Sequence, residues 1–342
     1  MRPAYCASVT TLAATVLAAL AGTAAQAASL REGVLARLAQ ATTTPTAPPT
    51  AAGCLVPAGN GYGGYESPYA LVASVCDPAL TPDYRTGFKL ASNFGSWTVT
   101  PSSEWANLDA MLALQSAWGP WYLPFPAPDN VLSMTLFEQT ARVLAATTYH
   151  LGNVPYRHAH SAEWLVMPAP GWLEAGFPPG AGFDCSDYSH FNYNMALGVQ
   201  LYPGISEQAQ QTTAEVHVAS TDGASSNVVT VSSTVLFDVR AGWNKNYDEL
   251  VHGLQPGDLL YIRSDPKLTL NISHVIMWLT PLATDSLGKD GYLVTDSFGD
   301  VAFDSNGNQV PSGPQIRPFL NTTYYFNCFD HVVRWLPLNV VT

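Results

Sequence analysis

The 342-residue chain is poor in charge, and above all in positive charge. Only 12% of its residues are charged, and 14 lysines and arginines stand against 26 acidic residues, which gives a formal net charge of -12. A chain this acidic has no general attraction for nucleic acid or for an anionic membrane surface. Hydrophobic residues make up 47% of the sequence, which is enough apolar material to form a folded core.

Apolar runs long enough to span a membrane are missing beyond the first residues of the chain. Residues 1–27 have the order of a secretory signal peptide: the single charge of Arg2, a short apolar run, and small residues at Ala25 and Ala27. We therefore expect cleavage after Ala27, a secreted or periplasmic protein, and no integral membrane segment in the mature chain. A spanning helix is the alternative, which the shortness of the run disfavours.

Cysteine is also scarce. Of five cysteines, Cys6 would leave with the signal peptide and four would remain in an oxidising compartment, where disulfides persist. Cys54 and Cys76 flank a loop rich in Gly, Pro and Tyr and are the natural pair. Cys185 and Cys328 are then either joined or free, and a nucleophilic role for Cys185 requires it to be free.

Residues with metal-ligand spacing are few. His158 and His160 would face the same way on a strand, and imidazole binds zinc. No further cluster of Cys, His or carboxylate follows at ligand spacing, so neither a metal nor another cofactor is predicted.

The chain divides into segments of different composition. Residues 28–53 are rich in Pro, Thr and Ala and predict an extended linker, because they offer almost no apolar surface to bury. Residues 54–130 form an aromatic-rich N-terminal extension without repeat or motif, with one expected helix near 104–117. Residues 131–342 form the main domain.

The main domain is predicted to be an α+β fold with helices first and a mainly antiparallel sheet afterwards. A capping box at Thr135 and Glu138 predicts a helix to residue 150, and a second helix is expected over 185–197 with one face in the core. Alternating residues around Asp222-Gly223 predict a β-hairpin within 214–237. Later strands are expected at 258–263, 274–279, 292–297 and 331–336.

A thiol stands at the start of the second helix, in Asp184-Cys185-Ser186. Backbone amides at a helix N-terminus stabilise a thiolate, which is the form that attacks a carbonyl. Asp184 or Ser186 can cap this helix. A cysteine taken alone is more often a buried structural residue, so the interpretation depends on what else the chain supplies.

Four motifs occur in one order: Pro155-Tyr156, Asp184-Cys185-Ser186, Leu254-Gln-Pro-Gly-Asp258 and His274-Val275. In this order they resemble the NlpC-type cell-wall peptidases of the papain-like cysteine peptidase superfamily. The resemblance covers roughly residues 135–340. It implies a papain-like NlpC-type fold, with the hairpin as an insertion between nucleophile and base.

The resemblance also implies roles for individual residues. Cys185 would be the nucleophile and His274 its general base. The hydroxyl of Tyr156 and the Cys185 amide would stabilise the oxyanion, and Asp184 and Ser186 would lie in the same oxyanion and substrate-binding region. No cofactor is implied.

The third catalytic residue should lie on the strand after His274 and orient the imidazole. In the family it is often another His, but residues 292–297 contain none. We predict Asp296, because a carboxylate can hold the imidazolium, with Thr295 as the alternative register. An ordinary turn role for Asp296 stays open.

The chain departs from the family at Arg157-His-Ala-His160, where a Trp-Gly-Gly-like run is usual, and at Asp187, where a Gly is usual. A carboxylate at residue 187 should oppose thiolate formation unless it points to solvent or pairs with a cation such as Arg157. The resemblance implies hydrolysis of an amide in peptidoglycan stem peptides. The alternatives are an amidase or acyltransferase acting on a non-murein amide, and a catalytically inactive cell-wall-binding module.

Overall fold

A computed structural model describes most of residues 131–342 and short pieces of the preceding region. The described residues are 65–72, 75, 88–91, 97–100, 127–128, 130–147, 151, 156, 183–219, 226–267 and 271–341. The predicted signal peptide, the linker, the helix near 104–117 and the His158/His160 pair lie outside these ranges.

An eight-stranded sheet organises the described residues, and each neighbouring pair of its strands is antiparallel. The strand order is β13-β10-β8-β7-β14-β6-β5-β4. The bounds are β4 (Val199–Gln200), β5 (Thr213–Ala219), β6 (Ser226–Leu236), β7 (Leu259–Arg263), β8 (Ile272–Trp278), β10 (Leu293–Phe298), β13 (Gly313–Pro318) and β14 (Phe329–Val340).

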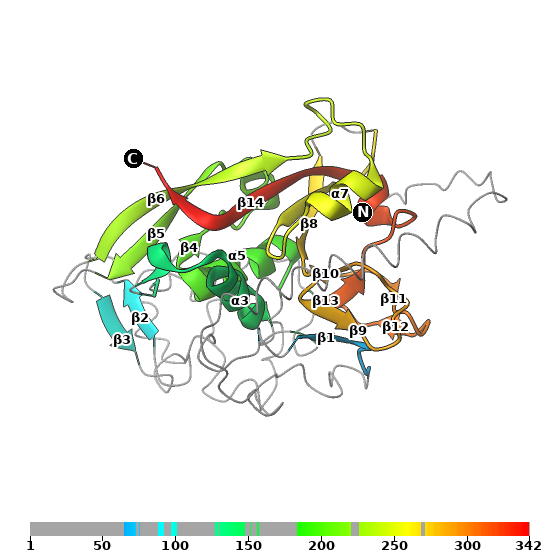
Figure 1. Ribbon diagram of the computed structural model, residues 1–342, viewed down its shortest axis with the longest axis horizontal. Helices are drawn as coiled ribbons and strands as arrows, with labels where there is room; N and C mark the ends of the chain where they lie inside the picture. Colours follow the sequence, from blue (N-terminus) through cyan, green and yellow to red (C-terminus); the bar gives the residue numbers. More distant parts are fainter. Residues whose placement is uncertain are drawn as a thin grey trace.

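Helices and smaller strand pairs surround this sheet (Figure 1). The helices are η4 (Val131–Ser133), α3 (Leu136–Thr147), α5 (Cys185–Leu197), α6 (Ile205–Gln208), α7 (Tyr247–Gly253) and α8 (Tyr324–Asn327). The two-stranded pairs are β1 (Tyr69–Leu71) with β9 (Ala283–Asp285), β2 (Phe88–Ala91) with β3 (Trp97–Thr100), and β11 (Ala302–Phe303) with β12 (Gln309–Val310). The predicted α+β class is therefore confirmed.

Capping residues mark the start of α3 and the end of α5. Thr135 and Glu138 form the predicted capping box before α3, with reciprocal bonds of 2.7 Å and 3.2 Å between side chains and backbone amides. Helix α5 spans the predicted residues 185–197. It ends at Gly198, whose left-handed φ of 69° suits a residue without a Cβ, and whose amide donates to Asn194 O.

The sheet carries one apolar core on each face, because successive strand residues point to opposite sides. On β8, Val275 and Met277 join the core covered by α3 and α5, whereas Ile276 and Trp278 join the core to which α7 and α8 contribute. Strand β8 is therefore buried on both faces. Figure 1 shows α3 and α5 side by side beneath the sheet.

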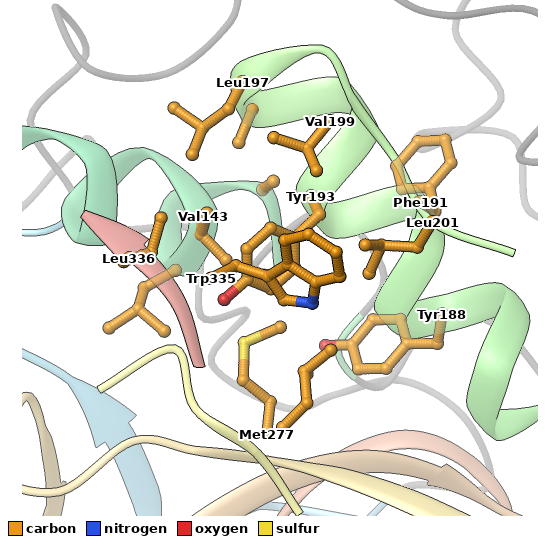
Figure 2. Close-up of a cluster of buried hydrophobic side chains, with 14 of the residues drawn as sticks. Val143, Tyr188, Phe191, Tyr193, Leu197, Val199, Leu201, Met277, Trp335 and Leu336 are labelled. Atoms are coloured by element: carbon orange, nitrogen blue, oxygen red, sulfur yellow. The ribbon is translucent and has the colours of Figure 1, made fainter. Parts of the chain in front are cut away.

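Helix α5 is the centre of the first core. The expected face of this helix lies in the core, and the burial extends to all 13 of its residues, which was not predicted. Figure 2 shows the reason: the Trp335 indole of β14 lies among side chains of α3, α5 and β8, including Val143, Tyr193 and Met277. A helix that is enclosed on every side holds its N-terminus in a fixed place.

The predicted strands are present, and the predicted hairpin is formed by β5 and β6. This hairpin belongs to the main sheet, because β6 pairs with β14 and β5 pairs with β4. Strand β13 and helices α6, α7 and α8 were not predicted. No helix in the described part of the chain is both long and apolar enough to cross a membrane.

The cysteines differ in state. Cys185 is a free thiol, whereas Cys328 is disulfide-bonded. A Cys185–Cys328 disulfide and a free Cys328 are therefore both excluded. The partner of Cys328 lies outside the described residues, where the other cysteines are Cys6, Cys54 and Cys76. If Cys6 leaves with the predicted signal peptide, the partner is Cys54 or Cys76, and the predicted Cys54–Cys76 pair is then wrong.

Replacing Trp335 tests this account of the core. Trp335→Ala should lower the free energy of unfolding by about 3–5 kcal/mol, because the side chain is 1% exposed and leaves a large cavity. Val340→Ala, on the same strand but 46% exposed, is the control and should change it by less than about 0.5 kcal/mol. Urea unfolding measures both, and equal small effects would contradict the placement of Trp335.

Candidate active site

The N-terminus of α5 is fixed by Asp184. Its Oδ1 accepts from the Asp187 amide at 2.9 Å and from the Ser186 hydroxyl at 3.1 Å. Asp184 is therefore the capping residue, and both side chains are buried. These contacts give Asp184 and Ser186 a role in holding Cys185. Because these hydrogen bonds hold the side chains of Asp184 and Ser186 within the helix cap, they do not favour the predicted contact of these side chains with substrate.

Helix α5 places the Cys185 thiol at the edge of β8. The sulfur lies 4.0 Å from the carbonyl oxygen of Ser273. In the described sheet, β10 pairs with β8 only at Val294–Trp278 and Thr295–Met277, so it does not cover β8 at Ser273. The thiol takes this uncovered edge, beside the backbone of His274.

His274, on β8, is surrounded by a carboxylate and two aromatic rings. Its Nε2 lies 2.6 Å from Asp296 Oδ2, and the residue is only 4% exposed. The Tyr325 ring stacks on it with centroids 5.8 Å apart and planes 8° from parallel. The Phe298 ring meets it edge-on at 5.0 Å. The imidazole therefore has one defined orientation.

Asp296 is the buried partner of His274, and Thr295 is not. Thr295 bonds Tyr188 and the Gln315 carbonyl on the side of α5, which follows from strand alternation. Asp296 Oδ1 accepts from Arg317 Nε at 2.7 Å, and Oδ2 also accepts from the Tyr325 hydroxyl. Burial raises the pKa of Asp296, but Arg317 and the bonds from His274 and Tyr325 outweigh it, so the pKa lies below its usual value.

The Cys185 thiol lies in a setting that opposes its ionisation. Burial is the main cause that raises its pKa, the charge of Asp184 adds to it, and Asp296 and Asp187 act in the same direction. The Val275 amide lowers the pKa but does not compensate. A thiolate would therefore have to be formed with a base at hand.

Asp187 is fully buried, so the alternative that its carboxylate points to solvent is wrong. The cause is the enclosure of α5 by the surrounding core. The other alternative, a pair with Arg157, involves a residue outside the described ranges.

Tyr156 lies beside the segment that leads into Cys185, as the motif order predicts. It forms a parallel β-bridge with Phe183, two residues before Cys185. Its ring lies over Gly299, where an added Cβ would come within 2.7 Å of the ring. Burial raises the pKa of Tyr156, with a further contribution from Cys185, so the hydroxyl stays protonated and can donate. Its oxyanion role stays a prediction.

Arg317 and Tyr325 were missed by sequence reasoning. They lie on β13 and α8, both of which are short elements without a recognisable pattern. One physical signal pointed to such a partner: a buried carboxylate needs a counter-charge or several donors. The sequence did not indicate which of its arginines supplies it.

Among the described residues, no three His, Cys, Asp or Glu side chains gather as metal ligands would. Comparison of the chain with protein-family models, curated proteins and solved structures found no match. The NlpC-type family and the papain-like fold therefore stay predictions from the motifs.

Removing the imidazole tests whether His274 acts on the thiol. In His274→Ala, alkylation of Cys185 by iodoacetamide at pH 7 should slow at least about tenfold, because the thiol loses its base. His252→Ala removes an exposed histidine of α7 and should leave the rate unchanged. Mass spectrometry of the Cys185 peptide gives the rates. An unchanged rate in His274→Ala would show that the imidazole does not act on the sulfur.

Proposed function

We propose that the protein is a cysteine hydrolase that cleaves an amide bond, with Cys185 as nucleophile and His274 as general base. The observation that carries this proposal is the 2.6 Å bond between His274 Nε2 and Asp296 Oδ2, on the strand whose edge the Cys185 thiol occupies. A purely structural cysteine would not need an oriented imidazole on the strand that its sulfur contacts. This arrangement has the three roles of a nucleophile, a base and an orienting group.

The bond to Asp296 assigns the two imidazole nitrogens. Nε2 donates its proton to the carboxylate, which leaves Nδ1 as the nitrogen that takes the thiol proton. The sulfur then forms a bond to the amide carbon. The imidazolium gives its proton to the leaving amine as the C–N bond breaks, and a thioester remains. Water, deprotonated by His274, attacks the thioester and releases a carboxylic acid and the thiol.

The raised pKa of the thiol fits a mechanism in which proton transfer accompanies attack. Burial and three nearby carboxylates disfavour a resting thiolate, so His274 would take the proton as the sulfur approaches the substrate. The oxyanion would receive donors from the first turn of α5, whose amides have no acceptor within the helix, and from Tyr156.

The substrate class comes from the motif order. We propose that the amide lies in a peptidoglycan stem peptide, which agrees with a predicted secreted or periplasmic location. Digestion of muropeptides would make the protein a peptidoglycan endopeptidase that needs no cofactor. Products that carry a transferred acyl group in place of a new carboxylate would favour the acyltransferase alternative.

A catalytically inactive wall-binding module is the second candidate. The observation that favours it is the burial of Cys185, which is 5% exposed and has a raised pKa. Such a module would bind peptidoglycan without cleaving it. The two candidates differ in whether new amine and carboxylate ends are formed.

Digestion of defined muropeptides tests the proposal. Cys185→Ala should lower kcat/KM at least about a thousandfold, because no other group replaces the nucleophile. Ser206→Ala, at an exposed position of α6, should digest at the rate of the parent. Mass spectrometry of the products identifies the bond. Equal digestion by the parent and Cys185→Ala proteins would exclude this mechanism.

A further inference from the structure

We propose that Arg317 and Tyr325 are positioning residues, which together hold Asp296 in the one orientation that lets its second oxygen keep His274 Nε2 protonated. This inference rests on the proposed function of Cys185 and His274. It adds two residues that no sequence motif indicates.

The Arg317 guanidinium is anchored on both of its sides. Nε donates to Asp296 Oδ1 at 2.7 Å, while Nη2 donates to the carbonyls of Gly313 at 3.2 Å and Pro311 at 3.3 Å. The carbonyls belong to the start of β13 and the turn before it, so the backbone fixes the guanidinium. Strand register explains the approach: Asp296 stands opposite Gln315, and Arg317 is the diagonal neighbour.

The site excludes water from this ion pair. Arg317 is 2% exposed and Asp296 is 1% exposed, and the Phe298 ring centroid lies 5.7 Å from the guanidinium carbon. A buried carboxylate that lost its arginine would keep its desolvation cost without the compensating charge. Arg317 is therefore the main counter-charge of the ionised Asp296, and the His274 imidazolium is the second.

Tyr325 contacts both members of the pair. Its hydroxyl donates to Asp296 Oδ2, the oxygen that also receives His274 Nε2, and its ring stacks on the imidazole. It therefore limits rotation of the carboxylate and of the imidazole at once. Tyr325→Phe would keep the stacking on the imidazole and lose only the hydrogen bond to Asp296.

A shift in pH dependence distinguishes an electrostatic positioning role of Arg317 from a role in packing alone. Removing the guanidinium leaves the His274 imidazolium as the remaining counter-charge of Asp296. This favours the imidazolium and opposes the thiolate, so both proton dissociations of the Cys185–His274 pair move to higher pH. Loss of packing alone lowers the rate without this shift. The other ionisable groups that act on the site are unchanged in such variants: Asp184, Asp187, Tyr156, Tyr261, Asp300 and Tyr324.

The experiment measures two pH profiles, the alkylation rate of Cys185 and kcat/KM on a muropeptide. Arg317→Met should move the limbs of both profiles upward by about one pH unit, and Arg317→Lys should restore them by restoring the charge. Tyr325→Phe should lower kcat about tenfold without a shift of the limbs and with little change in KM.

Arg334→Met is the matched control. Arg334 binds another buried aspartate, Asp258, at 2.6 Å and 2.8 Å, at the turn before β7. Its loss should leave both pH profiles in place. Circular dichroism establishes that each variant is folded, and if Arg317→Met does not fold, the lysine and phenylalanine variants decide the question.

The outcomes separate this inference from the proposed function. Unshifted limbs in Arg317→Met, or a Tyr325→Phe protein as active as the parent, would overturn the positioning role even if the parent digests muropeptides. If the parent digests none but Arg317→Met shifts the alkylation profile, the positioning role is supported and the substrate class is wrong.

Discussion

Asp296 is a carboxylate without access to water, and the geometry of the candidate site depends on how its charge is balanced. Arg317 provides the counter-charge, and Tyr325 and His274 provide hydrogen bonds. An ionised carboxylate in such a place is stable only when its oxygens are fully bonded, so these contacts also fix its orientation. The orientation of His274 follows from it. Such a network is sensitive to substitution, because loss of one member leaves the polar groups of the others without hydrogen-bond partners.

The thiol lies beside the backbone of β8, next to this network in the chain, because of the fold around it. Helix α5 is enclosed on every side and capped by Asp184, so the position of Cys185 is set by the core. The sheet contributes by leaving one edge of β8 uncovered where β10 diverges, and the sulfur lies at that edge. The same burial opposes ionisation of the thiol. The site thus combines precise placement of Cys185 with a thiol that does not ionise readily.

Much of the fold could be predicted from local signals. The capping box and the glycine after Leu197 delimit the two helices, and alternation delimits most strands of the main domain. The all-round burial of α5 could not be predicted, because its Asp, His and Asn residues suggest a solvent-facing side that only the tertiary structure removes. Asp296 could be predicted as the partner of His274 from its place on the next strand. Arg317 and Tyr325 could not, since their approach depends on the β10–β13 register and on a helix of four residues.

Asp296 determines which ring nitrogen of His274 carries the proton, through the bond to Nε2. Nitrogen NMR of isotope-labelled histidine measures this tautomer directly. At a pH where the imidazole is neutral, the account predicts that Nε2 of His274 carries the proton and that Nδ1 is bare. In Asp296→Asn the side-chain amide can donate as well as accept, so this preference should weaken or reverse. A His274 in the parent protein with its proton on Nδ1 and a bare Nε2 would contradict the account.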